Sequence, residues 1–190
     1  MAIHLPVQLQ RHTFTVSDYH RMLEAGILTE DDRVELICGE IIAMAPIGTR
    51  HATCANGLNE ILGQVLRRRA VVSIQNPVVV GEGSEPQPDI AVTRLPRSRY
   101  ANAHPTPADI FLLIEVADTT AVHDREMKVP LYGKAGVPET WLIDLATRRI
   151  EAYREPSANG YRSLRYAYPG DTLTPSSFPD VTLAVDEVLV

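Results

Sequence analysis

The chain has 190 residues, of which 45% are apolar and 22% charged, as is typical of one globular domain. This composition excludes a disordered chain, and no stretch approaches the roughly 18 consecutive apolar residues of a membrane span. With 18 basic and 24 acidic residues the net charge is −6, so a nucleic-acid partner would require a local basic patch.

Two cysteines, Cys38 and Cys54, are too few for a disulfide framework and lack metal-ligand spacing. We expect both thiols to be reduced and buried, as in intracellular proteins. The first ten residues contain neither a basic segment nor a continuous apolar run, so we recognise no export signal. The sequence therefore predicts a cytoplasmic protein that does not enter a membrane.

Helices and strands are predicted along most of the chain. Residues 1–12 indicate a loose N-terminal arm, and residues 13–190 a single domain. Helices are expected to begin near residues 15–18, at 48–50 and at 124, and the last two to end at 67–69 and at 136. Strands are expected at 33–37, 41–44, 71–74, 77–80, 89–93, 110–116, 140–144, 149–154 and 181–183. This order predicts an α/β (α+β) fold with one mixed central sheet flanked by helices.

Two carboxylates occupy positions that a purely structural strand would not favour. Asp89 follows a proline, which strands accept at their first position, so it is expected to open a strand; otherwise it is an ordinary turn residue. Glu115 lies in the apolar run 111–116, which indicates a buried central strand, and alternation places Phe111, Leu113 and Glu115 on one face. A carboxylate buried there must be paired, bind a metal or have a raised pKa, unless it lies at the solvated end of the strand.

Lys128 adds a cation to these two acids. On the third predicted helix it shares one face with Leu131 and with Tyr132, an expected core residue. Its ammonium is therefore expected to point toward the sheet, or else to extend to solvent at the rim. Two carboxylates such as Asp89 and Glu115 can hold Mg²⁺ or Mn²⁺, which polarises a phosphodiester and lowers the pKa of an attacking water. A nearby ammonium would position that water or stabilise the developing negative charge.

Three further polar residues could contribute to the same site. Glu40 could supply another carboxylate, or it is an ordinary hairpin acid. His51, at the start of the second predicted helix, could act as a general acid or base, or it caps and packs that helix. Gln87 could orient the attacking water or the Asp89 carboxylate. The serine, cysteine and histidine residues form no recognisable nucleophile motif, and the sequence has no glycine-rich phosphate loop.

These residues lie in sequence blocks that resemble the Uma family, whose members are described as restriction endonucleases. The resemblance covers about residues 13–185, and the order of several blocks makes it specific. The blocks are residues 32–37 with Gly39 and Glu40, 46–48 with His51, 85–90, 113–118, 124–125 with Lys128, 130–132, and 135–139 with 141–144.

The Uma family belongs to the PD-(D/E)xK nuclease superfamily, so the resemblance implies a restriction-endonuclease-like mixed sheet. It implies Asp89 as the motif aspartate, Glu115 as the second metal ligand and Lys128 as the lysine. In the simplest superfamily pattern the lysine follows the second acid by two residues, a position held here by Ala117. The resemblance therefore implies that the lysine lies on the next helix and that this helix folds back over the strand. Glu40 falls at a further acidic position of the family.

Together these observations predict a Mg²⁺- or Mn²⁺-dependent endonuclease that hydrolyses DNA, with a homodimer expected because such enzymes often pair to cut two strands. A basic surface would form if two arginine groups, 67–69 and 94–99, converge. One alternative is a non-catalytic binding module with a nuclease-like fold, in which Asp89, Glu115 and Lys128 diverge. The other is a metal-dependent hydrolase of a small phosphorylated molecule, which suits the net charge and predicts a pocket too narrow for a duplex.

Overall fold

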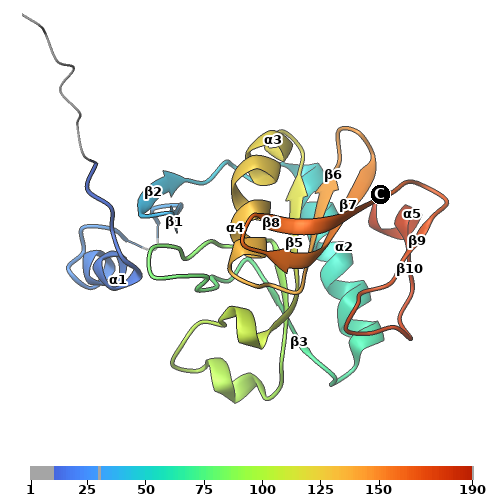
Figure 1. Ribbon diagram of the computed structural model, residues 1–190, viewed down its shortest axis with the longest axis horizontal. Helices are drawn as coiled ribbons and strands as arrows, with labels where there is room; N and C mark the ends of the chain where they lie inside the picture. Colours follow the sequence, from blue (N-terminus) through green and yellow to red (C-terminus); the bar gives the residue numbers. More distant parts are fainter. Residues whose placement is uncertain (1–10, 30, 190) are drawn as a thin grey trace, which may run out of the picture.

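A computed structural model of the protein describes residues 11–29 and 31–189 (Figure 1). Its centre is a six-stranded sheet in the order β3–β4–β5–β6–β7–β8, in which β5 and β6 are parallel and the other neighbours antiparallel. The predicted α/β (α+β) fold with a mixed central sheet is thus confirmed. Residues 1–10 of the expected arm lie outside the described residues. The strands of this sheet are β3 (Val71–Ile74), β4 (Ile90–Thr93), β5 (Ile110–Ala117), β6 (Glu139–Asp144), β7 (Arg149–Ser157) and β8 (Gly160–Ala167).

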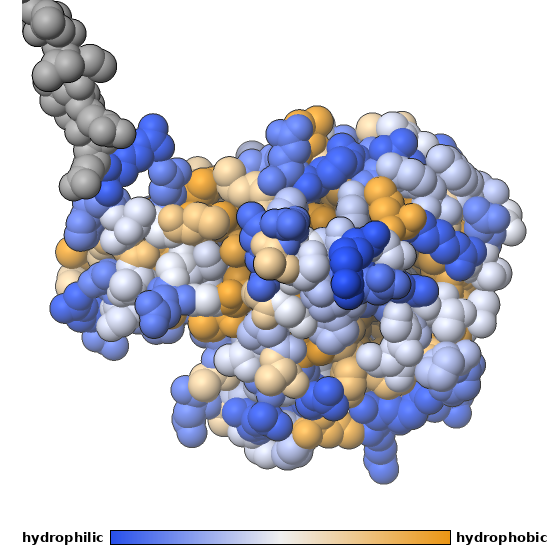
Figure 2. Space-filling model, viewed as in Figure 1, coloured by the Kyte–Doolittle hydropathy of each residue, from blue (hydrophilic) through white to orange (hydrophobic). Residues whose placement is uncertain are grey.

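Helices cover both faces of the sheet: α2 and α5 pack into the apolar cluster on one face, and α4 contacts β6, β7 and β8 on the other. None of the described helices is both long and apolar enough to cross a membrane, and hydrophilic side chains dominate the face shown in Figure 2. The helical elements are α1 (Val16–Glu24), α2 (Thr49–Leu66), η1 (Arg97–Tyr100), η2 (Pro107–Asp109), α3 (Ala121–His123), η3 (Asp124–Lys128), α4 (Val129–Lys134) and α5 (Val185–Val188). Two small antiparallel pairs complete the fold: β1 (Val34–Ile37) with β2 (Glu40–Ala43), and β9 (Thr172–Leu173) with β10 (Leu183–Ala184).

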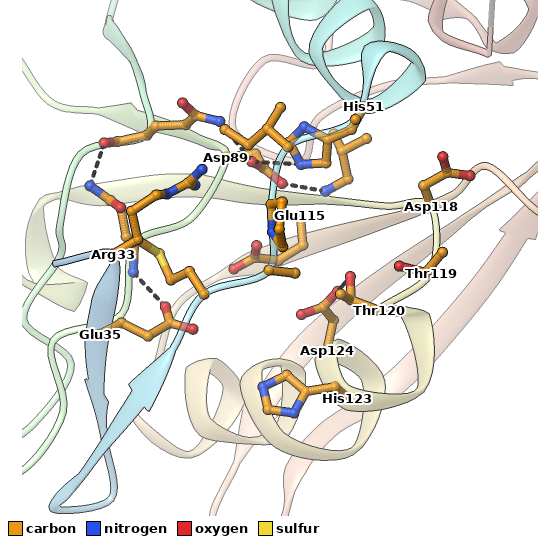
Figure 3. A pocket seen from close by; sticks show the side chains of 18 of the residues that line it. Arg33, Glu35, His51, Asp89, Glu115, Asp118, Thr119, Thr120, His123 and Asp124 are labelled. Atoms are coloured by element: carbon orange, nitrogen blue, oxygen red, sulfur yellow. Dashed lines mark hydrogen bonds and ion pairs between the residues drawn. The ribbon is translucent and has the colours of Figure 1, made fainter. Parts of the chain in front are cut away.

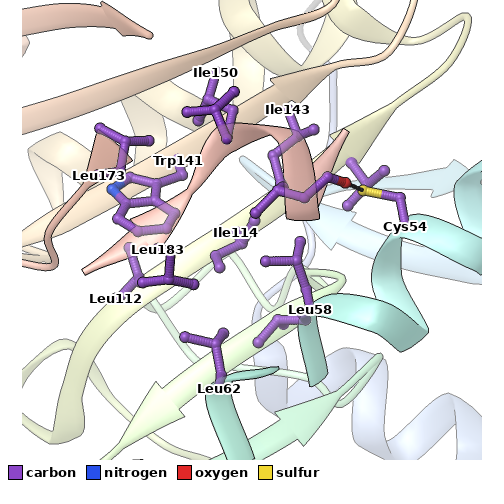
Figure 4. Packing of buried hydrophobic residues seen from close by; sticks show 14 of the residues in the cluster. Cys54, Leu58, Leu62, Leu112, Ile114, Trp141, Ile143, Ile150, Leu173 and Leu183 are labelled. Carbon is purple, nitrogen blue, oxygen red and sulfur yellow. Dashed lines mark hydrogen bonds between the residues drawn. The ribbon is translucent and has the colours of Figure 1, made fainter. Parts of the chain in front are cut away.

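Strand β5 separates two apolar clusters. On one face Ile114 packs with Leu58 of α2 (Figure 4). On the other face Leu113 packs with Tyr132 of α4, and the Tyr132 hydroxyl donates a hydrogen bond to Glu115. The expected alternation is therefore confirmed for Leu113 and Glu115, and it directs the Glu115 carboxylate toward the helix that follows the strand.

Phe111 departs from this alternation. Strand β4 pairs with Leu112 and then with Ile110, so Phe111 is an extra residue in β5 that bends the strand locally. Its ring packs edge to face against Phe178, with the ring centres 5.2 Å apart. The predicted common face of Phe111, Leu113 and Glu115 is therefore wrong for Phe111, because periodicity of two cannot anticipate a bulge.

The helical segment between β5 and β6 begins at Ala121, earlier than the predicted start at 124, and contains one turn of π-helix at Asp124–Lys128. Pro130 lacks the N–H that a regular α-helical bond would use, and the wider turn comes just before it. Lys128 and Tyr132 are buried and lie four residues apart on the face toward the sheet. The helix therefore folds back over β5, and the ammonium of Lys128 points inward as expected.

Several other predicted elements differ in the structure. Residues 77–80 form no strand, because the N–H groups of this segment donate to carbonyl oxygens of loop residues. The Val78 N–H donates to the Pro86 carbonyl, and the Val79 N–H donates to the Pro105 carbonyl. Strand β8 was not predicted, and the final strand lies at Leu183–Ala184 rather than 181–183. Helix α2 ends at Leu66, so the three arginines follow it instead of forming its last turn.

The β1–β2 hairpin turns at Cys38 and Gly39, both of which have positive φ angles, 52° and 80°. A two-residue turn with two positive φ angles matches the right-handed twist of the strands it joins. The turn leaves the Cys38 side chain exposed, whereas Cys54 of α2 is 1% exposed. The expectation that both thiols are buried is therefore wrong for Cys38.

The two cysteines should differ sharply in reactivity. Burial, with a smaller contribution from the Asp89 charge, raises the pKa of Cys54 to about 12, and its Sγ lies 3.2 Å from the Val188 carbonyl oxygen. A thiol reagent at pH 8 should therefore label one cysteine in the native protein and the second only after unfolding. Rapid labelling of both cysteines in the native state would contradict this burial.

Gly133 of α4 lies where the helix touches β8. A Cβ atom at this position would be 2.5 Å from the carbonyl carbon of Gly160, a backbone atom that cannot move aside freely. Gly133→Ala should therefore destabilise the protein by roughly 1–3 kcal/mol, as measured by denaturant unfolding. Gly63→Ala is the matched control in α2: nothing lies within 4 Å of its added Cβ, so stability should rise by about 0.5–1 kcal/mol.

Candidate active site

A pocket of about 440 Å³ opens where β4 begins and β5 ends. The β1–β2 hairpin, the first turn of α2 and the α3–η3 segment form its other walls (Figure 3). Segments far apart in the sequence therefore meet at one end of the central sheet. Five carboxylates line the pocket: Glu35, Asp89, Glu115, Asp118 and Asp124.

Asp89 immediately precedes β4 and is fixed by the neighbouring strand. Its Oδ2 accepts a hydrogen bond of 2.8 Å from the backbone N–H of Val116, the residue after Glu115. Its Oδ1 lies 3.0 Å from Nε2 of His51 and 3.5 Å from the Nε2 of Gln75. This network holds the Asp89 carboxylate beside the segment of β5 that carries Glu115.

Glu115 is buried in strand β5, with 3% of the residue exposed. The Tyr132 hydroxyl donates to its Oε1 at 2.5 Å, and Nζ of Lys128 lies 3.5 Å from the same atom. Burial raises the pKa of Glu115 well above its ordinary value; Lys128 lowers it, and the charges of Asp124 and Asp89 raise it further. Glu115 is therefore a carboxyl group whose negative charge lacks sufficient compensation from the protein.

Lys128 is 6% exposed, and its Nζ lies 3.0 Å from Oε2 of Glu35. Burial lowers the pKa of Lys128, but the carboxylates of Glu115, Glu35 and Asp124 raise it more, so its pKa lies above the ordinary value. The ammonium therefore stays charged at neutral pH. The ammonium lies between Glu35 of the β1–β2 hairpin and Glu115 of β5, and Lys128 lines the pocket.

Three of the five pocket acids, Glu35, Asp118 and Asp124, were not among the residues selected from the sequence. The Glu35 carboxylate of β1 accepts one hydrogen bond of 3.0 Å from the backbone N–H of Gln87. Asp124 accepts one at 2.7 Å from the Thr120 hydroxyl, and burial raises its pKa despite this bond. A signal for Glu35 was present, since it is an acid within an apolar strand, as Glu115 is. Asp124 looked like an ordinary residue at a helix start.

Residues 16–186 match the model of the Uma2 family, described as "Putative restriction endonuclease". The chain belongs to this family. No curated protein matches the sequence.

The chain is similar in structure to a protein whose crystal structure is described as that of "a putative nuclease belonging to DUF820" from Anabaena variabilis ATCC 29413. The two chains are 20% identical, the match covers 93% of this chain and 97% of the other, and the TM-score is 0.73. At this identity the comparison establishes the fold of the Uma2 chain, over nearly its whole length.

The other three residues selected from the sequence lie differently in this Uma2 chain. His51 reaches Asp89, and the hydrogen bond between them raises the pKa of His51 more than burial lowers it. The Gln87 side chain donates to the backbone oxygen of Gln75, so the amide nearest Asp89 is that of Gln75. Glu40 is exposed at the turn end of the hairpin, where it pairs with Arg11 at 2.8 Å, and it does not line the pocket.

The donor set of the pocket suits a hard divalent cation. The carboxylates of the pocket outnumber its cations: the ammonium of Lys128 faces Glu35, Glu115 and Asp124, and Asp89 and Asp118 also line the pocket. Burial is the main cause of the raised pKa values of Glu115 and Asp124, and the charges of neighbouring carboxylates raise them further. Carboxylate oxygens are the ligands that Mg²⁺ and Mn²⁺ prefer, and each engaged oxygen keeps a second lone pair for a metal.

Proposed function

We propose that the protein is a Mg²⁺- or Mn²⁺-dependent endonuclease that hydrolyses phosphodiester bonds in DNA. The observation that supports this most is the convergence of Asp89, Glu115 and Lys128 on one pocket in a member of the Uma2 family. A non-catalytic module would leave these side chains free to diverge. The proposal takes Asp89 and Glu115 as the metal ligands.

The bound cation, Asp89 and Lys128 each have a role in this proposal. A bound divalent cation would supply positive charge beside the scissile phosphate and lower the pKa of the attacking water. Asp89 is held by Val116 and His51 in a fixed orientation, which reduces the reorganisation needed to bind a ligand. Lys128, held by Glu35 at 3.0 Å, would position the water or stabilise the charge that develops on the phosphate.

The arginines expected to form a basic surface do converge in part. The guanidinium of Arg69 lies 5.3 Å from the centre of the Phe178 ring, that of Arg94 lies 4.5 Å from the Phe111 ring, and the two rings touch. Arg94 follows the last residue of β4, whereas Asp89 precedes the first. This arginine–aromatic cluster is therefore at the opposite end of the strand from the pocket.

The proposal includes a homodimer, because a duplex has two strands to cut and each chain carries Asp89, Glu115 and Lys128 once. Light scattering of the purified protein measures this directly. A monomeric mass with and without DNA would remove the dimer from the proposal while leaving the chemistry of the pocket untouched.

The size of the pocket favours a second candidate, a metal-dependent hydrolase of a small phosphorylated molecule. A volume of about 440 Å³ falls within the range of small-molecule sites, roughly 300–1,000 Å³. The excess of carboxylates around it would not attract a polyanion before a cation is bound. The two candidates share the same ligands and differ in substrate.

The test combines calorimetry with a cleavage assay. Wild-type protein should bind Mg²⁺ or Mn²⁺ and should nick or linearise supercoiled plasmid only in their presence, and EDTA should stop the reaction. Asp89→Ala should lose both properties. Glu60→Ala is the matched control, because Glu60 is an exposed acid on the outer side of α2.

The other outcomes are equally informative. Metal binding unchanged in Asp89→Ala would place the ion elsewhere and refute the assigned ligands. Hydrolysis of bis(4-nitrophenyl) phosphate or of a phosphomonoester, with no action on DNA or RNA, would support the second candidate. Metal binding without hydrolysis of any of these substrates would support a non-catalytic module.

A further inference from the structure

A second cluster of metal-binding side chains lies outside the pocket. His20 of α1, Glu85, and His104 in the loop after η1 each offer one ligand atom, and these atoms all lie within 4.8 Å of one another. In the part of the chain that the structure describes, no other three histidine, cysteine or acidic side chains come this close. The cluster joins three segments that are far apart in the sequence.

The geometry already approaches a coordination site. Nε2 of His20 lies 2.7 Å from Oε2 of Glu85, and the rings of His20 and His104 are 6.3 Å apart and inclined at 66°. In a tetrahedral zinc site, metal–ligand bonds of 2.0–2.2 Å place neighbouring ligand atoms roughly 3.3 Å apart. Small movements of the exposed His104 side chain would therefore complete the ligand set.

The backbone around each ligand is fixed before any ion binds. The Glu85 N–H donates to the Leu36 carbonyl of β1 at 2.8 Å, and Glu85 itself is 4% exposed. Helix α1 is held by the bond from Val16 N–H to the Glu82 carbonyl at 2.7 Å. The loop of His104 is held through its neighbour Pro105, whose carbonyl accepts from Val79 at 2.9 Å. Little additional ordering of these three backbone segments is therefore required for an ion to bind.

We propose that His20, Glu85 and His104 form a binding site for a divalent transition metal ion, with Zn²⁺ as its typical occupant. Two imidazoles and one carboxylate are the donor set of three-ligand zinc sites, whereas Mg²⁺ prefers oxygen ligands alone. His20 is half-buried and His104 exposed, which leaves a fourth position for water. The ion joins α1 and the His104 loop to the segment that leads from Glu85 to Asp89.

This site is independent of the proposed catalysis, and its test keeps the two apart. Protein freed of metal with EDTA is titrated with Zn²⁺ by calorimetry in the presence of excess Mg²⁺. We expect one equivalent of Zn²⁺ to bind the wild type, and His20→Ala and His104→Ala each to weaken binding by at least roughly tenfold. His12→Ala, an exposed histidine outside the cluster, and Asp89→Ala should bind Zn²⁺ as the wild type does.

Thermal unfolding gives a second readout. Zn²⁺ at 100 times its Kd should raise the Tm of the wild type by roughly 5–10 °C and should leave the Tm of His20→Ala unchanged. The visible spectrum of the Co²⁺-loaded wild type is a third readout, and it requires no variant. Co²⁺ bound by nitrogen ligands in a tetrahedral site should absorb visible light strongly.

Three results would overturn the proposal. If Zn²⁺ does not bind, the cluster is only a hydrogen-bonded His20–Glu85 pair. If Asp89→Ala abolishes binding and His20→Ala does not, the ion occupies the carboxylate pocket instead. If His12→Ala weakens binding as much as the cluster variants do, the histidines bind metal nonspecifically.

Discussion

Lys128→Met is expected to slow phosphodiester cleavage by roughly 10²–10³-fold, the cost of losing one well-placed charge at a developing anion. The same variant should bind Mg²⁺ as tightly as the wild type or more tightly. Nζ of Lys128 lies 3.0 Å from Glu35 and 3.5 Å from Glu115, so it competes with a metal for their negative charge. Single-turnover cleavage and calorimetry on the same preparation measure the two effects separately.

Lys134→Met provides the control, because Lys134 is the other lysine of the chain and lies exposed at the end of the same helix. Its activity should equal that of the wild type. If Lys128→Met loses metal binding together with activity, the lysine acts by holding the pocket together. In that case its proposed role at the phosphate is wrong.

Glu151→Ala is expected to destabilise the protein by about 3 kcal/mol, a decrease in Tm of roughly 6–12 °C. Glu151 is fully buried, and its carboxylate accepts hydrogen bonds from Arg125, Arg149 and Tyr153. Its removal leaves both guanidinium groups without this partner. This value is at the lower end of the destabilisation expected when a buried ion pair is broken, because the Arg125 and Arg149 side chains are 31% and 27% exposed.

The pH dependence of this effect follows from the pKa of Glu151. Burial raises that pKa, but the hydrogen bonds from Arg125, Tyr153 and Arg149 lower it more, so it lies below its ordinary value. The difference in stability between wild type and Glu151→Ala is therefore full at neutral pH and should shrink as the pH falls below about 4.

Glu155→Ala, in the same strand, is the control for this variant. Glu155 is exposed, and its ion pair with Arg162 is 4.0 Å long, so stability should change by less than about 0.5 kcal/mol. Equal losses of stability in the two variants would show that the Arg125–Glu151–Arg149 network contributes nothing specific. Urea unfolding at pH 7 and at about pH 3 provides the comparison.

The positions of Glu115 and Lys128 could be predicted because each depends on short-range periodicity, and that of Asp89 because the proline before it marks the start of a strand. Alternation in an apolar strand determines where Glu115 points, and the helical repeat places Lys128 on the same face as Tyr132. These rules hold as long as the element is regular. They fail at Phe111, where one extra residue in β5 moves the ring to the other face.

The choice between Glu35 and Glu40 could not be made from local sequence. Both acids belong to the β1–β2 hairpin, and only its open end, with Glu35 and Ala43, lines the pocket. Which end of a hairpin approaches the sheet depends on tertiary contacts such as the bridge between Leu36 and Glu85. Strand β8 was missed for a related reason, since as an edge strand it carries many exposed polar residues and lacks an apolar run.

The separation of charge along β4 contributes a local electric dipole, which the ion pair of Arg69 with Asp180 offsets in part. Carboxylates gather around Asp89 at one end of the strand, and Arg69 and Arg94 lie beside the aromatic rings at the other, roughly 16 Å away for five extended residues. In the field of a polyanion this dipole turns the arginine end forward and the pocket away. For the proposed DNA substrate, productive docking would therefore require the charge of the pocket to be neutralised first, and we expect cation and then nucleic acid as the order of binding.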